Sequence, residues 1–291
     1  MKFSVKHRTS YRYSSNVTTS HHEARLLPRA SDQQKVLAAE VVVSPSPSSV
    51  RRRQDYFGNR TLHFSISEPH RALDVVATSV VEITPLPAPL PELSPPWEGV
   101  VERLASDRRR DVLDAYQMTF ESPHVTKGAD FLEFARPCFP AGRPVLEAVN
   151  ALSGRIHSEF AYDNSSTDVS TPLSQVLEQK RGVCQDFAHL MIACLRSLGL
   201  AARYVSGYLL THPPPGKPKL VGADASHAWV SVWLPRSGWI DFDPTNDVMP
   251  RDEHITTAYG RDFSDVTPLR GVIHGGGQHV LEVSVDVNVA E

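Results

Sequence analysis

The sequence contains no apolar run that approaches the roughly 18 residues needed to span a bilayer. Its first residues, Met1 to His7, also lack an apolar run of the signal-peptide type. We therefore expect a soluble protein that is located in the cytoplasm and has no membrane as a partner.

Cysteine is scarce, and neither sign of charge dominates. The three widely spaced cysteines do not suggest a disulfide framework, and in a reducing compartment they leave a thiol free to react. The formal net charge of −3 gives no reason to expect nucleic acid as a partner. The local arginine clusters at 51–53 and 108–110 are best interpreted as solvated surface.

Proline is concentrated in one segment. Residues 85–96, PLPAPLPELSPP, are half proline, which excludes a helix or a central strand because the ring fixes φ and removes the N–H donor. We place an extended linker there, at 85–97. It would join a β-rich domain at 1–84, where Leu62, Phe64 and Ile66 alternate with polar residues, to a core domain at 98–265. A β tail at 266–291 would follow.

The core mixes helical and strand patterns. Apolar residues recur at helical spacing between Val145 and Ile156, and again between Phe187 and Leu198. Three segments of strand type follow, at 202–209, 228–234 and 239–242, and the tail alternates strictly over 280–287. The whole is an α+β protein with a β-rich N-terminal domain.

Three short stretches of the core could combine into one reactive site. Cys184 begins the second helix, where the helix N-terminus favours a thiolate. His227 lies in a strand and could exchange a proton with that thiol and with a leaving amine. Asp243 ends the next strand and could orient the imidazole. The backbone N–H of Cys184 would supply half of an oxyanion hole.

Each of these residues also has a purely structural interpretation. A cysteine within an apolar helix is usually a small core residue, which suits Cys194, and Cys138 between two prolines also reads as structural. A lone histidine in a strand is more often a hydrogen-bonded structural residue than a catalyst, and Asp-Pro-Thr is a common turn. The three stretches together, each at the end of an element, favour catalysis.

The same residues resemble the transglutaminase-like superfamily, in its bacterial two-domain branch. The resemblance rests on four linked motifs: Gly182-Val183-Cys184, Arg203-Tyr204-Val205-Ser206-Gly207-Tyr208, His227-Ala228-Trp229, and Gly238-Trp239 with Asp243-Pro244-Thr245. N-terminal and C-terminal segments such as Asp55–Asn59 and Gly260–Val266 are similar to the same branch. The resemblance implies a papain-like α+β core, in which the cysteine helix packs on an antiparallel sheet, behind the β-rich domain.

The resemblance also implies roles for single residues. Cys184 matches the nucleophile, His227 the general base and acid, and Asp243 the orienting carboxylate, with Asp241 as a minor alternative two positions earlier. Tyr162 stands where animal transglutaminases carry a tryptophan that donates to the oxyanion, and a phenol can donate one hydrogen bond. Packing under the following helix is an equally good interpretation of Tyr162.

Five further residues are candidates for a substrate groove. Gln185 and Asp186 follow the nucleophile and could shape the acyl pocket or cap the helix, and Tyr208 and Trp229 could line the groove or pack in the core. Tyr259 lies in a loop that could close over the site, on resemblance alone. We expect no cofactor. A zinc site formed by Cys184, His189, His227 and Asp243 is disfavoured, because no closely spaced pair of ligands is present.

These residues predict an enzyme that cleaves a peptide, protein or small amide through a thioester at Cys184. Papain itself is disfavoured, because its histidine follows the cysteine by about 130 residues or more, whereas His227 follows Cys184 after 43 positions. Transamidation by an amine is the alternative to hydrolysis, and a catalytically silent peptide-binding module is a further one. The sequence indicates neither the substrate nor the oligomeric state.

Overall fold

Two antiparallel sheets organise the chain in the computed structural model, which describes residues 1–164, 166–167, 171–211 and 226–290. The larger sheet has seven strands and runs in the order β2-β5-β1-β4-β3, with β12 and β13 also paired to β1. Its strands are β1 (Lys2–Ala24), β2 (Gln34–Ser44), β3 (Ser49–Gln54), β4 (Arg60–Ile66), β5 (His70–Ile83), β12 (Leu269–Gly275) and β13 (His279–Val289).

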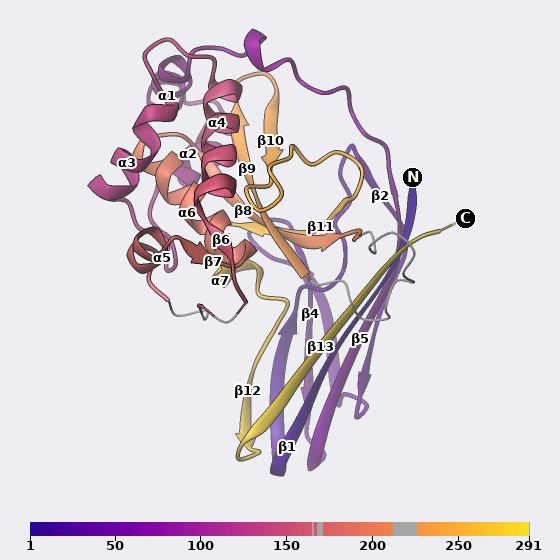
Figure 1. Ribbon diagram of the computed structural model, residues 1–291. Coiled ribbons are helices and arrows are strands. Elements are labelled where there is room, and N and C mark those ends of the chain that lie inside the picture. Colours follow the sequence, from indigo (N-terminus) through magenta and orange to yellow (C-terminus); the bar gives the residue numbers. More distant parts are fainter. Residues whose placement is uncertain (165, 168–170, 212–225, 291) are drawn as a thin grey trace, which may run out of the picture.

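The long strand β1 is the centre of this sheet. Near its start, Phe3 pairs with Val81 of β5 on one side and with Val289 of β13 on the other. At its end, Ala24 pairs with Leu62 of β4 and Leu269 of β12. The two strands of the C-terminal tail therefore complete the N-terminal sheet, and the chain termini lie side by side in Figure 1.

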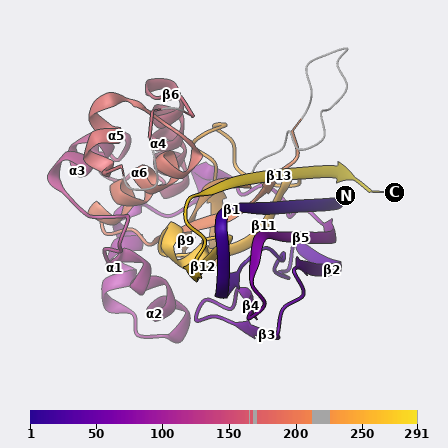
Figure 2. The same cartoon turned by 90° about the horizontal axis from the view of Figure 1, so that it is seen from below.

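Helices fill the middle of the chain. Figure 2 shows them gathered beside the long strands rather than stacked on them. They are α1 (Trp97–Ser106), α2 (Arg110–Tyr116), α3 (Ala129–Ala135), α4 (Val145–Glu159), α5 (Leu173–Gln179), α6 (Cys184–Ser197) and α7 (Phe263–Val266), with short 3-10 turns at Pro91–Leu93, Gln117–Thr119 and Arg136–Cys138. None of the helices in the described ranges is long and apolar enough to cross a membrane.

The smaller sheet supports the cysteine helix. Its order is β10-β9-β8-β11, with β8 (Ala202–Leu209), β9 (Ser226–Leu234), β10 (Gly238–Phe242) and β11 (His254–Gly260). Helix α6 lies against β8 and β9 and is also packed by α3, α4 and α5. It can be covered on all sides because it is apolar around most of its circumference, and Leu190, Met191 and Leu195 are fully buried.

The two sheets are joined at the outer edge of β11. Edge strands leave N–H and C=O groups unpaired, and two side-chain amides from the N-terminal domain satisfy them here. Gln34 accepts from the N–H of Thr256 and donates to its carbonyl, at 2.8 Å each. Asn59 likewise accepts from the N–H of Tyr259 at 3.0 Å and donates to its carbonyl at 2.9 Å. Apolar side chains bury the rest of the junction, among them Phe3, Val81, Tyr208 and Ile255.

The predicted α+β class, with a β-rich N-terminal region and a helix on an antiparallel sheet, is confirmed. The predicted strand at 202–209 has those bounds, and the strands predicted to begin at Ala228 and Trp239 begin at Ser226 and Gly238. The domain limits at 84, 97 and 265 stay predictions. The structure adds that β12 and β13 of the tail pair within the first sheet.

Gly207 is the point at which the small sheet tolerates no side chain. A Cβ atom there would overlap the carbonyl oxygen of Ile255 and the ring of Trp229. We expect Gly207→Ala to lower the free energy of unfolding by about 1–3 kcal/mol, as overpacking does. Urea unfolding would measure it.

Gly99 in α1 is the matched control, because a Cβ there meets nothing within 4 Å. Gly99→Ala should raise the free energy of unfolding, by up to about 1 kcal/mol, through helix propensity. Equal effects of the two substitutions would contradict the packing described around Gly207.

Candidate active site

Asp243 is the buried anchor of the site. It directly follows β10, and its side chain is fully shielded from solvent. One carboxylate oxygen, Oδ1, accepts the backbone N–H groups of Thr245 and Asn246 at 3.0 and 3.2 Å, which closes the Asp-Pro-Thr turn. The other, Oδ2, lies 2.7 Å from Nε2 of His227. The turn therefore holds the carboxylate through Oδ1 and leaves Oδ2 free to bond the histidine.

The protonation of this pair follows from its surroundings. Burial alone would raise the pKa of Asp243, but hydrogen bonds from His227, His254 and Asn246 and the charge of His227 hold that pKa well below its usual range. An ionised carboxylate only accepts hydrogen bonds, so Nε2 of His227 carries a proton and donates it to Asp243. The Nδ1 atom of His227 is then the nitrogen that can serve the thiol.

His227 is held as a cation. Burial would lower its pKa, but the hydrogen bonds to Asp243 and Cys184 and the charges of both partners raise the pKa to about 10. The unfolded value is about 6.5. The stability that this charge contributes is therefore fully present below about pH 6.5, and it is lost as the pH rises through about 10.

Cys184 is the first residue of α6, and its side chain is half-buried. The thiol lies within hydrogen-bond reach of the His227 imidazole, and its hydrogen bond and charge are among the causes that raise the pKa of His227. The other two cysteines lie in the core, and burial raises the pKa of both thiols. The structure thus separates Cys184 from Cys138 and Cys194.

Asp186 acts as the cap of the cysteine helix. Its carboxylate accepts the backbone N–H of Val183 at 2.9 Å and the hydroxyl of Thr167 at 2.6 Å. A Cβ on Gly182 would lie only 2.7 Å from this carboxylate, which explains the glycine. Of the two functions considered for Asp186, the structure shows the cap. Gln185, its neighbour, is half-buried beside the thiol-bearing residue.

Tyr162 is brought to the thiol by a two-residue parallel ladder. Strand β6 (Ala161–Tyr162) pairs with β7 (Arg181–Gly182), so that Tyr162 lies opposite Gly182. Burial and the nearby charges of Cys184 and Asp186 raise the pKa of the phenol. The side chain keeps 54% of its surface exposed, so its hydroxyl can meet a bound substrate.

Three residues predicted for the substrate groove lie elsewhere. Trp229 is fully buried, and Tyr208 is 2% exposed, so neither can line an open groove. The Tyr208 hydroxyl lies 3.1 Å from Nδ1 of His7, in the core between the sheets. Tyr259 lies in strand β11 and not in a loop that could close over the site, and the guanidinium groups of Arg29 and Arg203 pack on its ring. Strand patterns could not show which of several interior surfaces each aromatic residue faces.

The structure also separates Asp241 from Asp243. The indole N–H of Trp229 donates to Oδ2 of Asp241 at 3.0 Å. Asp241 thus supports the tryptophan whose ring lies 6.0 Å from that of His227, whereas Asp243 bonds the His227 imidazole directly.

His254 is a residue of the site that sequence reasoning missed. Its Nε2 donates to Oδ2 of Asp243 at 2.9 Å, and only 8% of its side chain is exposed. Asn246 donates to the same oxygen at 2.7 Å. Asn246 lies in the Asp-Pro-Thr turn and could have been noticed, but nothing in the sequence ties His254, at the start of the following strand, to Asp243. Both residues position the aspartate.

His227, Asp243 and His254 are also a possible ligand set for a metal. Their candidate ligand atoms all lie within 4.8 Å of one another, and two imidazoles with a carboxylate suit a divalent transition metal. The same atoms are engaged in the hydrogen bonds of 2.7 and 2.9 Å. His189 is not part of this group, because its Nε2 accepts the N–H of Phe263 in the core. The expectation of no metal stays a prediction.

Comparison with known proteins identifies the family. Residues 3–82 match the model of the bacterial transglutaminase-like N-terminal region, and residues 133–244 match that of the transglutaminase-like superfamily. The second span includes Cys184, His227 and Asp243. The chain belongs to the transglutaminase-like superfamily.

Relatives within the superfamily cover the whole chain. An uncharacterized protein of Mycobacterium tuberculosis is 41% identical over 98% of this chain and 92% of its own length. One of Mycobacterium leprae is 37% identical over 97% of both chains. The crystal structure of a candidate cysteine protease from Cytophaga hutchinsonii has a TM-score of 0.77 and 20% identity, covering 100% of this chain and 91% of that one. At that identity it shows the shared transglutaminase-like fold.

A local relationship involves a named enzyme of the superfamily. The protein-glutamine gamma-glutamyltransferase of Pseudomonas aeruginosa is 35% identical over 97 residues, which are 32% of this chain and 14% of that protein.

Asp243 should control the charge of His227, because its hydrogen bond and its charge are among the causes that raise the histidine pKa to about 10. In Asp243→Asn we expect the pKa of His227 to fall by more than one unit. NMR titration of the imidazole ring protons measures this directly.

The matched control is Asp241→Asn, which changes the carboxylate that holds Trp229 instead. It should leave the titration of His227 close to that of the native protein. A larger fall in Asp241→Asn than in Asp243→Asn would reverse the assignment of the two aspartates.

Proposed function

We propose that this protein is a thiol-dependent amide hydrolase that works through a thioester at Cys184. The observation that carries the proposal is the position of His227. Its Nε2 lies 2.7 Å from Oδ2 of buried Asp243, and its ring is hydrogen-bonded to the thiol of Cys184 at the start of α6. A thiolate paired with an imidazolium is the reactive form of a cysteine nucleophile. The membership of this chain in the transglutaminase-like superfamily also supports a cysteine nucleophile.

In the first half of the reaction, the Cys184 thiolate attacks the carbonyl carbon of the amide. The backbone N–H of Cys184 and the phenol of Tyr162 would stabilise the oxyanion that forms. His227 then donates its Nδ1 proton to the nitrogen as the C–N bond breaks, so that an amine or ammonia leaves and the acyl group remains on sulfur. Asp243 and His254 keep the imidazole ring in place throughout.

In the second half, His227 is neutral at Nδ1 and accepts a proton from water. The resulting hydroxide attacks the thioester, the C–S bond breaks, and a carboxylic acid leaves while the thiolate and imidazolium are restored. The expected substrate is a peptide, a protein or a small amide, and we expect the reaction to take place in the cytoplasm.

Transamidation is the second candidate, because the similar segment of the Pseudomonas aeruginosa relative belongs to a protein-glutamine gamma-glutamyltransferase. The chemistry differs only in the second half, where a primary amine replaces water. The access of water to the acyl-enzyme decides between the two outcomes. A silent peptide-binding module, the remaining alternative, would need no reactive thiol.

Selective alkylation tests the nucleophile without a substrate. We expect iodoacetamide at neutral pH to modify Cys184 at least tenfold faster than free cysteine, because an adjacent imidazole activates a cysteine nucleophile. Cys138 and Cys194 should stay unmodified, because both side chains are buried. Mass spectrometry of tryptic peptides measures the extent of alkylation at each cysteine over time.

The control for alkylation is the urea-unfolded protein, in which all three cysteines should react alike. A rate at Cys184 no greater than that of free cysteine, in the folded protein, would contradict the proposal and favour a silent module.

Turnover is tested on a library of peptides and isopeptides, with and without an added primary amine. Hydrolysis predicts free acids and released amines in both conditions, whereas transamidation predicts amide products when the amine is present. Cys184→Ala should lower the rate by on the order of 10⁵-fold, because no thioester can form.

Cys194→Ala is the comparison variant, because it removes a thiol from the same helix without touching the site. It should keep the activity of the native enzyme once its folding is confirmed by circular dichroism. Full activity in Cys184→Ala would refute the thioester mechanism.

A further inference from the structure

A cavity lies behind the candidate triad, with His254 in its wall. It has a volume of about 420 Å³, within the range of small-molecule sites. Tyr204 of β8 contacts His189 of α6, with ring centroids 4.9 Å apart, so the adjacent Arg203 points to the opposite face of the sheet. Arg203 lines this cavity, which therefore lies on the sheet face away from α6. Residues 86–89 of the proline-rich segment form part of its wall.

The cavity carries an excess of positive charge. Three arginines line it, at positions 29, 203 and 251, against a single carboxylate, that of Asp241. Asp241 is already engaged by the indole of Trp229. Within the described part of the chain, none of the three arginines has a carboxylate within salt-bridge distance.

Arg203 is the most informative of these cations. Its guanidinium lies over the rings of Trp239 and Tyr259, at 4.2 and 3.6 Å from their centroids. Its Nε is buried and has no hydrogen-bond partner in the structure. Burial lowers the pKa of Arg203 to about 10, so the group is still charged at neutral pH. The charge of Asp241 and a hydrogen bond with Tyr259 partly offset this burial, and an anionic ligand would stabilise the cation further.

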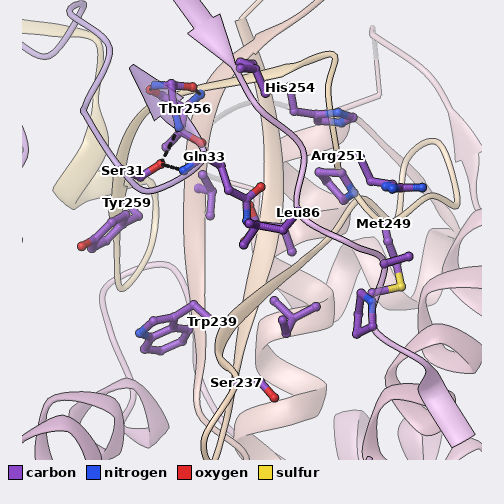
Figure 3. A pocket seen from close by; sticks show the side chains of 18 of the residues that line it. Ser31, Gln33, Leu86, Ser237, Trp239, Met249, Arg251, His254, Thr256 and Tyr259 are labelled. Carbon is purple, nitrogen blue, oxygen red and sulfur yellow. Dashed lines mark hydrogen bonds between the residues drawn. The ribbon is translucent and has the colours of Figure 1, made fainter. Parts of the chain in front are cut away.

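The other two arginines have different positions. Arg29 donates to the carbonyl of Phe57, the side-chain oxygen of Asn59 and the hydroxyl of Tyr259, so three of its five N–H donors are used by the protein. Arg251 is exposed, and Figure 3 shows it at the same end of the cavity as His254. The cations that could serve a ligand are thus Arg203 inside and Arg251 at the rim.

The remaining lining mixes apolar and aromatic side chains with polar ones such as Ser31, Gln33 and Ser237. Figure 3 shows Trp239 and Tyr259 on one side and Leu86 and Met249 on the other. Apolar groups pack well against side chains such as Leu86 and Met249, and a guanidinium recognises a carboxylate by charge-assisted hydrogen bonds. We propose that this cavity binds a small organic carboxylate with an apolar body, its carboxylate directed to Arg203, with Arg251 at the rim.

The site is distinct from the thiol but shares a wall with the triad. His254 lines the cavity while its Nε2 donates to Asp243. A ligand there would lie against the residue that positions the catalytic aspartate. Its binding can be measured without turnover, and so independently of the proposed function.

Phenylacetate is a suitable probe, with phenylacetamide as the uncharged ligand of the same shape. Isothermal titration calorimetry at constant ionic strength should show phenylacetate binding at least tenfold more tightly than the amide. Arg203→Met should weaken that binding at least tenfold, and Arg251→Gln several-fold. Arg52→Gln, on exposed β3 of the other sheet, should leave it unchanged.

Three results would overturn the proposal. The first is equal affinity for phenylacetate and phenylacetamide. The second is binding of inorganic phosphate without binding of phenylacetate. The third is loss of phenylacetate binding in Cys184→Ala but not in the arginine variants, which would place the probe at the thiol. If Arg203→Met does not fold, Arg251→Gln decides, because its side chain is exposed.

Discussion

The buried carboxylate of Asp243 is the interaction on which the rest of the site depends. A charge that is fully removed from water is stable only when its oxygens are satisfied. Two backbone N–H groups of its own turn and the side chains of His227, Asn246 and His254 donate hydrogen bonds to these oxygens. Because the histidines come from β9 and β11, one carboxylate ties the two strands together. The same bonds hold the His227 imidazole ready for the thiol.

The N-terminal domain contributes to this arrangement through β11. Gln34 and Asn59 satisfy the backbone of Thr256 and Tyr259 along the free edge of that strand. His254 begins the same strand and bonds Asp243. The placement of His254 therefore depends on a domain that supplies no member of the triad. This dependence gives a physical reason for keeping the β-rich domain and the core in one chain, with the tail strands closing the sheet.

Much of the fold and of the site could be predicted because the signals are local. Helical spacing after Cys184 places the thiol at a helix start, and strand alternation places His227 and Asp243 at strand ends. The aromatic residues could not be assigned in this way. Trp229 and Tyr208 are buried on interior surfaces that alternation cannot tell apart, and Tyr259 belongs to a cavity formed by distant segments. His254 carries no local signal, since its role arises only where β11 meets the end of β10.

The sequence by itself indicated a candidate trio of Cys184, His227 and an aspartate of the segment 241–243. It also indicated the helix that carries the thiol, the strands beside it and the proline-rich connection. Each of these follows from propensity and spacing within a few residues. Only the tertiary structure decided that Asp243 rather than Asp241 bonds His227, that Asp186 caps the helix, and that His254 completes the buried cluster. It also created the arginine-lined cavity, because Arg29, Arg203 and Arg251 meet through long-range packing that no local pattern encodes.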